Sequence, residues 1–111
     1  MTPPPELNAG VAAELARGRA AQAAGLPGRA RVCARRAAGL ALKAWFQARS
    51  GEAWGGDAMK QLKRAQAEPA APEAVRAAAE RLTTKVDYDH ALPFADDPLV
   101  DAELIIAFAR S

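Results

Sequence analysis

A long proline-free stretch, residues 29–50, constrains the fold of this chain more than any other feature: it reads RARVCARRAAGLALKAWFQARS. Gly25-Leu26-Pro27-Gly28 interrupts the chain just before it, and Ser50-Gly51 ends it, because glycine suits the left-handed position after a helix. Its small and apolar residues recur at three- and four-residue steps and so share one helical face. They are Cys33, Ala37, Leu40, Ala41, Ala44 and Ala48, with Val32, Gly39, Leu42 and Phe46 widening the face. Because a helix this apolar needs several neighbours, we expect it to be the central helix of a bundle.

The composition favours helices throughout. Half of the 111 residues are hydrophobic and only 5% are aromatic, while alanine, the strongest helix former, is abundant and β-branched residues are sparse. A chain of this length builds one core rather than two. We therefore predict an all-α fold, an up-and-down four-helix bundle with one additional short helix, as a single domain over residues 6–111. Three consecutive prolines predict a flexible, extended tail over residues 1–5.

Four further helices are predicted around the central one. The first covers residues 6–24 and forms an antiparallel hairpin with the central helix through a short turn. A short helix begins at Asp57, whose carboxylate can cap it. A longer helix covers residues 72–86, with Pro72 as its first residue, and Asp97-Pro98 begins the last. The residues expected to be most buried are Leu40, Phe46, Leu82, Leu104 and Phe108, and Val100 and Ile105 are also expected to face inward.

The sequence contains no predicted membrane span and no predicted signal peptide. Lys43 and Arg110 cut short the longest apolar runs, and the N-terminus lacks a positive region followed by an apolar core. The single cysteine, Cys33, cannot form an internal disulfide, which fits a reducing cytosol, and we interpret it as a small core hydrophobe. These features predict a cytoplasmic protein that does not bind membranes.

Charge is divided unevenly along the chain. Residues 1–50 hold eight Lys and Arg against two acids, and residues 51–111 hold seven against eleven. Arg29, Arg36 and Lys43 recur every seven residues and form a basic stripe on the central helix, with Arg35 beside it. The stripe could contact the phosphate of a nucleotide or an RNA. The alternatives are a solvated helix face, or ion pairs to the acidic C-terminal half.

Two other clusters carry alternatives. Trp45 and Trp54 lie near one end of the central helix, either as interface anchors or as a lid over the edge of the core. Since one small bundle cannot easily cover so apolar a helix, we predict a homodimer whose interface includes one of them. Asp87, Asp89 and His90 could form a metal or acid–base cluster, although neighbouring loop acids are more often solvated or act as caps. We therefore predict no metal, no cofactor and no catalytic residue.

Three segments resemble the HEPN domains, small helical partners of minimal nucleotidyltransferases. Cys33–Ala44 is similar to the family motif in which alanines alternate with a polar pair and end in Ala-Leu-Lys-Ala. Ala77–Thr84, followed by a loop with aspartate and tyrosine, resembles the fourth helix and its exit. Val100–Ala109 is similar to the closing helix, where Asp-Ala-Glu precedes an apolar run. The resemblance implies a helical bundle that associates with a nucleotidyltransferase-like protein or binds a nucleotide itself.

The chain departs from the catalytic members of that family. Its ribonucleases carry an arginine and a histidine four to six residues apart, whereas His90 follows Arg81 by nine positions. Gly56-Asp57 stands where many members have a histidine, and Asp87–His90 stands in place of an Arg-Tyr-Pro-Asp loop. We therefore expect a non-catalytic binding module. The alternative is a degenerate HEPN-type ribonuclease toxin.

Overall fold

The computed structural model describes residues 5–50, 56–85 and 97–111, with side chains from residue 8 onward. These residues form five helices: α1 Pro5–Ala23, α2 Pro27–Ser50, α3 Ala58–Gln66, α4 Glu73–Thr83 and α5 Pro98–Arg110. No residue in these three ranges belongs to a strand, so the predicted all-α class is confirmed. Within the same ranges, no helix is both long and apolar enough to cross a lipid bilayer.

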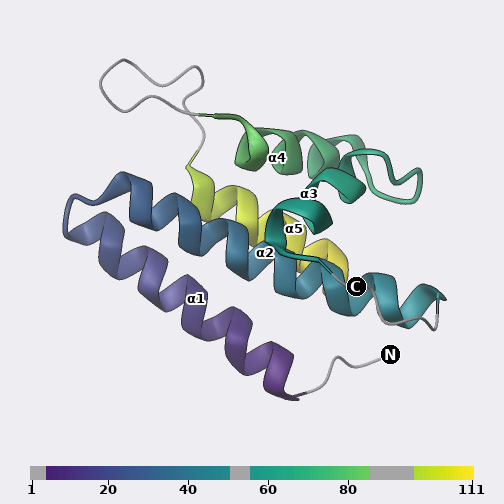
Figure 1. Cartoon of the computed structure of the whole chain (residues 1–111), viewed down its shortest axis with the longest axis horizontal. Coiled ribbons are helices and arrows are strands. Elements are labelled where there is room, and N and C mark those ends of the chain that lie inside the picture. Colours follow the sequence, from purple (N-terminus) through teal and green to yellow (C-terminus); the bar gives the residue numbers. More distant parts are fainter. Residues whose placement is uncertain (1–4, 51–55, 86–96) are drawn as a thin grey trace.

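The long α2 is the central helix, as the sequence predicts, but it begins at Pro27 and not at Arg29, because proline fits the first turn of a helix. α1, α3 and α5 all pack against it, while α4 packs mainly on α3 and α5. Figure 1 shows α1 and α4 on opposite sides of α2.

The turn between α1 and α2 is a Schellman motif. The Leu26 N–H donates to the Ala21 carbonyl at 2.8 Å, and the Gly25 N–H donates to the Gln22 carbonyl at 3.0 Å. Gly25 has a φ of 74°, which a residue with a side chain rarely adopts. The predicted helical hairpin is therefore confirmed.

The starts of the later helices follow the predicted caps with one exception. The Asp57 carboxylate accepts from the Lys60 N–H at 3.0 Å, and the Asp97 carboxylate accepts from the Leu99 N–H at 2.8 Å. Pro72 was wrongly predicted as the first helical residue of α4. Its ψ of 155° is extended, so it precedes the helix. α4 also ends early, at Thr83, because Thr84 already has an extended backbone.

The core confirms part of the predicted set and corrects the rest. Phe46 and Leu82 are almost fully buried, as predicted, together with Leu42, Leu62 and Ile105. Leu40 and Phe108 are only partly buried and pack against the edge of this core.

The predicted inward face of α5 was wrong in part: Ile105 is buried as predicted, but Val100 and Leu104 are not. Val100 and Leu104 are 61% and 40% exposed, and the face that packs inward carries Leu99, Asp101, Ala102, Ile105 and Ile106. α5 is apolar on nearly all sides, so its periodicity fits more than one orientation. On α2, the predicted face members Ala48 and Val32 are also exposed.

Two glycines allow helices to approach closely. A Cβ on Gly39 of α2 would lie 2.6 Å from the Ala58 backbone at the start of α3. A Cβ on Gly18 of α1 would lie 2.6 Å from the Leu99 side chain and 3.3 Å from Cys33. The close packing of α3 against Gly39 places the first turn of α3 beside the basic stripe.

Candidate anion-binding face

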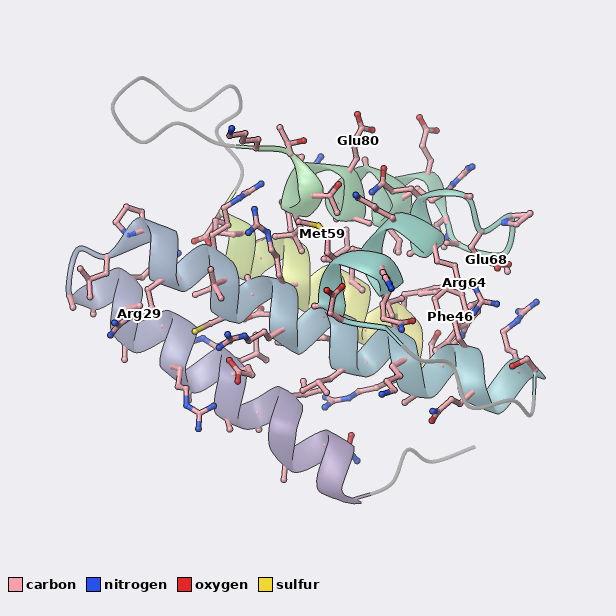
Figure 2. The ribbon with its side chains drawn as sticks, in the orientation of Figure 1. Arg29, Phe46, Met59, Arg64, Glu68 and Glu80 are labelled. Carbon is pink, nitrogen blue, oxygen red and sulfur yellow. The ribbon has the colours of Figure 1, made fainter. Side chains whose placement is uncertain are left out.

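The basic stripe predicted on α2 lies along two pockets that meet at Arg36. Arg29 and Arg36 are exposed, and Lys43 is half-buried. Arg29 and Arg36 line a pocket between α1 and α2, and Arg36 and Lys43 line a second pocket where α3 begins. Figure 2 shows Arg29 near the α1–α2 turn. The seven-residue spacing therefore aligns the three cations along one continuous face.

The first pocket, named here the arginine pocket, combines cations with an apolar floor. Its volume is about 670 Å³, within the range of pockets that hold small organic ligands. Arg17, Arg29 and Arg36 are the charged residues that line it, and no acid in the described part of the chain does so. The floor consists of Ala20, Ala21, Ala24, Leu26, Gly28, Val32 and Cys33. Such a lining suits a ligand with an anionic group and a flat apolar body.

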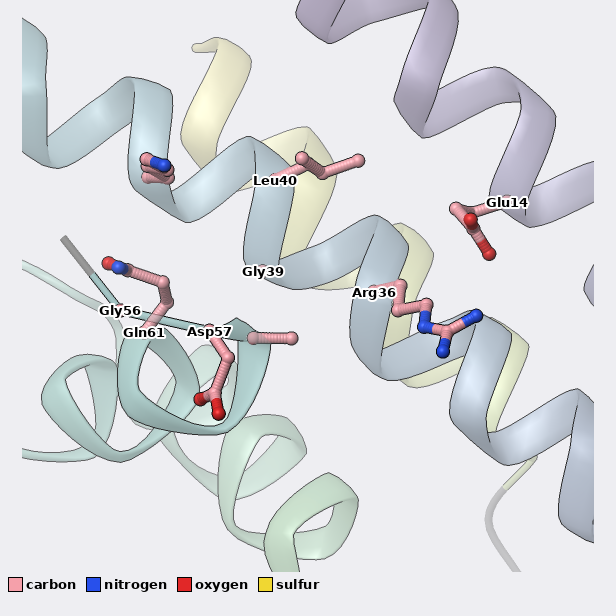
Figure 3. Close-up of a pocket in the computed structure, with 9 residues that line it drawn as sticks. Glu14, Arg36, Gly39, Leu40, Gly56, Asp57 and Gln61 are labelled. Atoms are coloured by element: carbon pink, nitrogen blue, oxygen red, sulfur yellow. The ribbon is translucent and has the colours of Figure 1, made fainter.

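The second pocket contains charges of both signs and has a volume of about 280 Å³. Figure 3 shows Glu14 of α1 across from Arg36 of α2, with Asp57 and Gln61 on the α3 side. The Glu14 carboxylate also accepts from Arg17 at 2.9 Å. Because the acids offset Arg36 and Lys43, this pocket attracts an anion less strongly than the arginine pocket does.

The stripe side chains form no direct ion pair within the described part of the chain. The side chains of Arg29, Arg36 and Lys43 make no ion pair or hydrogen bond with any residue in 5–50, 56–85 or 97–111. The pairing of the basic half with the acidic half runs instead through Arg19 of α1 and Glu103 of α5. Among the described residues, the predicted alternative of ion pairs to the C-terminal half therefore holds for Arg19 and not for the three stripe residues.

The structure does not bring Arg35 to either pocket. Its Nε donates to the Leu82 carbonyl at 2.6 Å, at the end of α4. The buried Arg31 donates to the Arg81 carbonyl and to the Thr84 carbonyl, the latter at 2.8 Å. Two guanidinium groups thus satisfy carbonyls at the negative end of the α4 dipole. Conversely, sequence reasoning missed Arg17, whose place in the pocket depends on how α1 packs on α2.

Trp45 belongs to an aromatic cluster at the far end of α2. Its ring lies 5.2 Å from the Phe46 ring and 4.9 Å from the Phe108 ring, measured between centroids, and the Arg49 guanidinium lies over it at 4.6 Å. The side chain is half-buried. Trp54 lies outside the described residues, so its predicted interface role stays a prediction.

Cys33 is buried on the floor of the arginine pocket, as predicted for a small core hydrophobe. Burial raises the pKa of its thiol, and the nearby Glu14 carboxylate raises this pKa further, against the smaller opposing effects of Arg36 and Arg17. The thiol is therefore neutral at neutral pH and acts as part of the apolar floor.

The Asp87, Asp89 and His90 segment lies outside the described residues. Within the described ranges, no three His, Cys, Asp or Glu side chains lie close enough together to hold a metal ion. The predicted alternatives for that segment therefore stay predictions.

No protein-family model matches the chain, and neither a curated protein nor a solved structure matches it significantly. The HEPN resemblance thus stays a prediction based on Cys33–Ala44, Ala77–Thr84 and Val100–Ala109.

Proposed function

We propose that this chain is a non-catalytic helical binding module, a HEPN-like up-and-down four-helix bundle with one additional short helix. Its arginine pocket binds a phosphate-bearing ligand, and a nucleotide fits best. One observation carries the proposal: Arg29 and Arg36 line one pocket and have no anionic partner among the described residues.

The choice of a nucleotide follows from the two parts of the lining. Guanidinium groups bind phosphate oxygens in a two-point geometry. Arg29 and Arg36 offer two such groups, and Arg17, which also donates to Glu14, offers a third. Val32 and Leu26 are exposed apolar side chains on the same pocket, 37% and 45% exposed. A base covering them would remove apolar surface from water. Inorganic phosphate would use only the arginines and should bind more weakly.

A nucleotidyltransferase-like protein is the proposed macromolecular partner, on the strength of the HEPN resemblance alone. An adjacent nucleotidyltransferase gene, with co-purification of the two products, would support it. The second function, a degenerate ribonuclease, depends on His90. Cleavage of RNA that disappears in His90→Ala would favour that function over the non-catalytic one.

Calorimetric titration of the protein with ATP tests the nucleotide proposal. Arg36→Gln should weaken binding about tenfold to a hundredfold, since hydrogen bonds between charged groups contribute about 1.5–3 kcal/mol. Arg76→Gln is the matched control, because Arg76 is an exposed arginine on α4, away from the pocket. Rising salt should weaken binding by the wild-type protein. Equal affinity of the two variants would overturn the proposal.

A further inference from the structure

A second surface, on α5, is apolar and exposed. Val100 and Leu104 are the most exposed large apolar residues of this helix, at 61% and 40%, and Ala107 is also exposed. The three residues are four and three positions apart, so they form one continuous strip along the helix. The opposite face of α5 packs against α2 and α4. We call Val100, Leu104 and Ala107 the α5 strip.

Opposite charges lie along one edge of the α5 strip. Glu103 and Arg110 are exposed and seven positions apart, so they share that edge. Glu103 pairs with Arg19 of α1 where both side chains are about half exposed. Arg110 makes only a 3.4 Å hydrogen bond to Asn8 and has no carboxylate partner among the described residues. The edge therefore presents an acid near its middle and a base at its end.

We propose that the α5 strip is the contact between two copies of this chain, with the two α5 helices packed antiparallel about a two-fold axis. In that arrangement, Leu104 packs against the partner's Ala107, a large side chain against a small one. In an antiparallel pair, the edge of one α5 strip that carries Glu103 and Arg110 also lies beside the same edge of the partner's strip. Glu103 therefore comes within reach of the partner's Arg110, and the two-fold axis repeats the pair.

A second copy fits this surface because the surface complements itself. Parallel packing would set Leu104 against the partner's Leu104. It would also place the edge with Glu103 and Arg110 beside the opposite edge of the partner's strip, so both charge pairs would be lost. Antiparallel packing also opposes the two helix dipoles favourably. A strip on a helix of 13 residues is small for an interface, so the dimer should dissociate on dilution in the micromolar range.

This interface is separate from the proposed ligand site and differs from the one expected at Trp45 or Trp54. The arginine pocket lies on α1 and α2, and none of its lining residues belongs to α5. Trp45 already packs against Phe46 and Phe108 and is covered by Arg49. The α5 strip is thus the less covered apolar surface.

A charge exchange followed by sedimentation tests the contact. Glu103→Arg and Arg110→Glu each replace two attractive pairs by two repulsive ones, so each variant alone should sediment at 11.6 kDa. An equimolar mixture restores both attractive pairs and should sediment at twice that mass. Arg19→Gln is the control: it removes the partner of Glu103 within the chain and should leave the dimer intact. Circular dichroism melting checks that every variant is folded.

Leu104→Glu should also give a folded monomer, whereas Val32→Glu, at a similarly exposed apolar residue of α2, should still dimerise. Three results would overturn the proposal: a monomeric wild type throughout a micromolar series, dimers in both single charge variants, or a mixture that stays monomeric. Dimers in both charge variants, combined with tryptophan fluorescence that changes on dilution, would move the interface to Trp45 or Trp54.

Discussion

The Arg81 guanidinium of α4 and the Asp101 carboxylate of α5 form a two-point ion pair, with Nε to Oδ2 at 3.1 Å and Nη2 to Oδ1 at 2.8 Å. The Asp101 side chain is only 4% exposed, whereas the Arg81 side chain is 26% exposed. Asp101 lies in the first turn of α5, near the positive end of that helix dipole, and Arg81 lies in the last turn of α4, near the negative end of its dipole. Each charge therefore also interacts favourably with its own helix dipole. The pair fixes which side of α5 faces α4.

Because Asp101 is more deeply buried than Arg81, the two residues should differ in how much their loss destabilises the fold. Arg81→Ala leaves a buried carboxylate unpaired and should lower the free energy of unfolding by about 3–5 kcal/mol. Asp101→Ala leaves an arginine that water can reach, and should cost less. Chemical denaturation of both variants and of the double variant measures the difference. Equal costs for the two single changes would show that burial does not set the energy of the pair.

The corrected face of α5 predicts contrasting effects for two leucines. Leu82→Ala removes a fully buried side chain and should cost about 2–5 kcal/mol. Leu104→Ala, at 40% exposure, should cost the monomer less than about 1 kcal/mol, as surface changes usually do. Urea denaturation at low protein concentration separates folding from association. A loss at Leu104 as large as at Leu82 would restore the orientation predicted from the sequence.

Local sequence signals predicted most of the helices. The features that they missed, such as the place of Arg35, depend on how the helices pack against one another. The caps at Asp57 and Asp97 and the turn at Gly25 depend on a few adjacent residues, so the sequence was sufficient. The stripe on α2 followed from its period. Whether Arg35 lies with that stripe depends on where α4 ends, and no local pattern contains that information.

Alanine substitution should have opposite effects on stability at two helical glycines, Gly39 of α2, which lies against α3, and Gly10 of α1, which lies near Leu40. Gly39→Ala places a Cβ 2.6 Å from the backbone of Ala58, so it should cost about 1–3 kcal/mol through overpacking. Gly10→Ala meets only the end of the Leu40 side chain at 3.2 Å, which can shift. The gain in helix propensity, about 1 kcal/mol, should then keep that variant at least as stable as the wild type. Thermal melts of both proteins provide the comparison, and a stabilised Gly39→Ala would contradict the close approach.

The buried thiol predicts a loss of stability at high pH. Because burial and Glu14 raise the pKa of the Cys33 thiol above its ordinary value in the folded chain, the unfolded chain releases this proton first. The contribution of Cys33 is therefore complete below the unfolded pKa, about 8.5, and is lost as pH rises through the folded pKa. Denaturation at a series of alkaline pH values should show a steeper decline for the wild type than for Cys33→Ala. Identical slopes would remove the thiol as the cause.

Arginine side-chain NMR during a nucleotide titration reports on the arginine pocket itself. As ATP is added, the Nε–H signals of Arg17, Arg29 and Arg36 should shift together and saturate together, because the three guanidinium groups line one pocket. Signals of Arg76 on α4 and Arg110 on α5 should stay in place, since neither residue lines it. Shifts confined to Arg49, which lies over the Trp45 ring, and Arg64, which lies over the Phe46 ring at 4.0 Å, would contradict nucleotide binding at this pocket. So would the absence of any saturable shift.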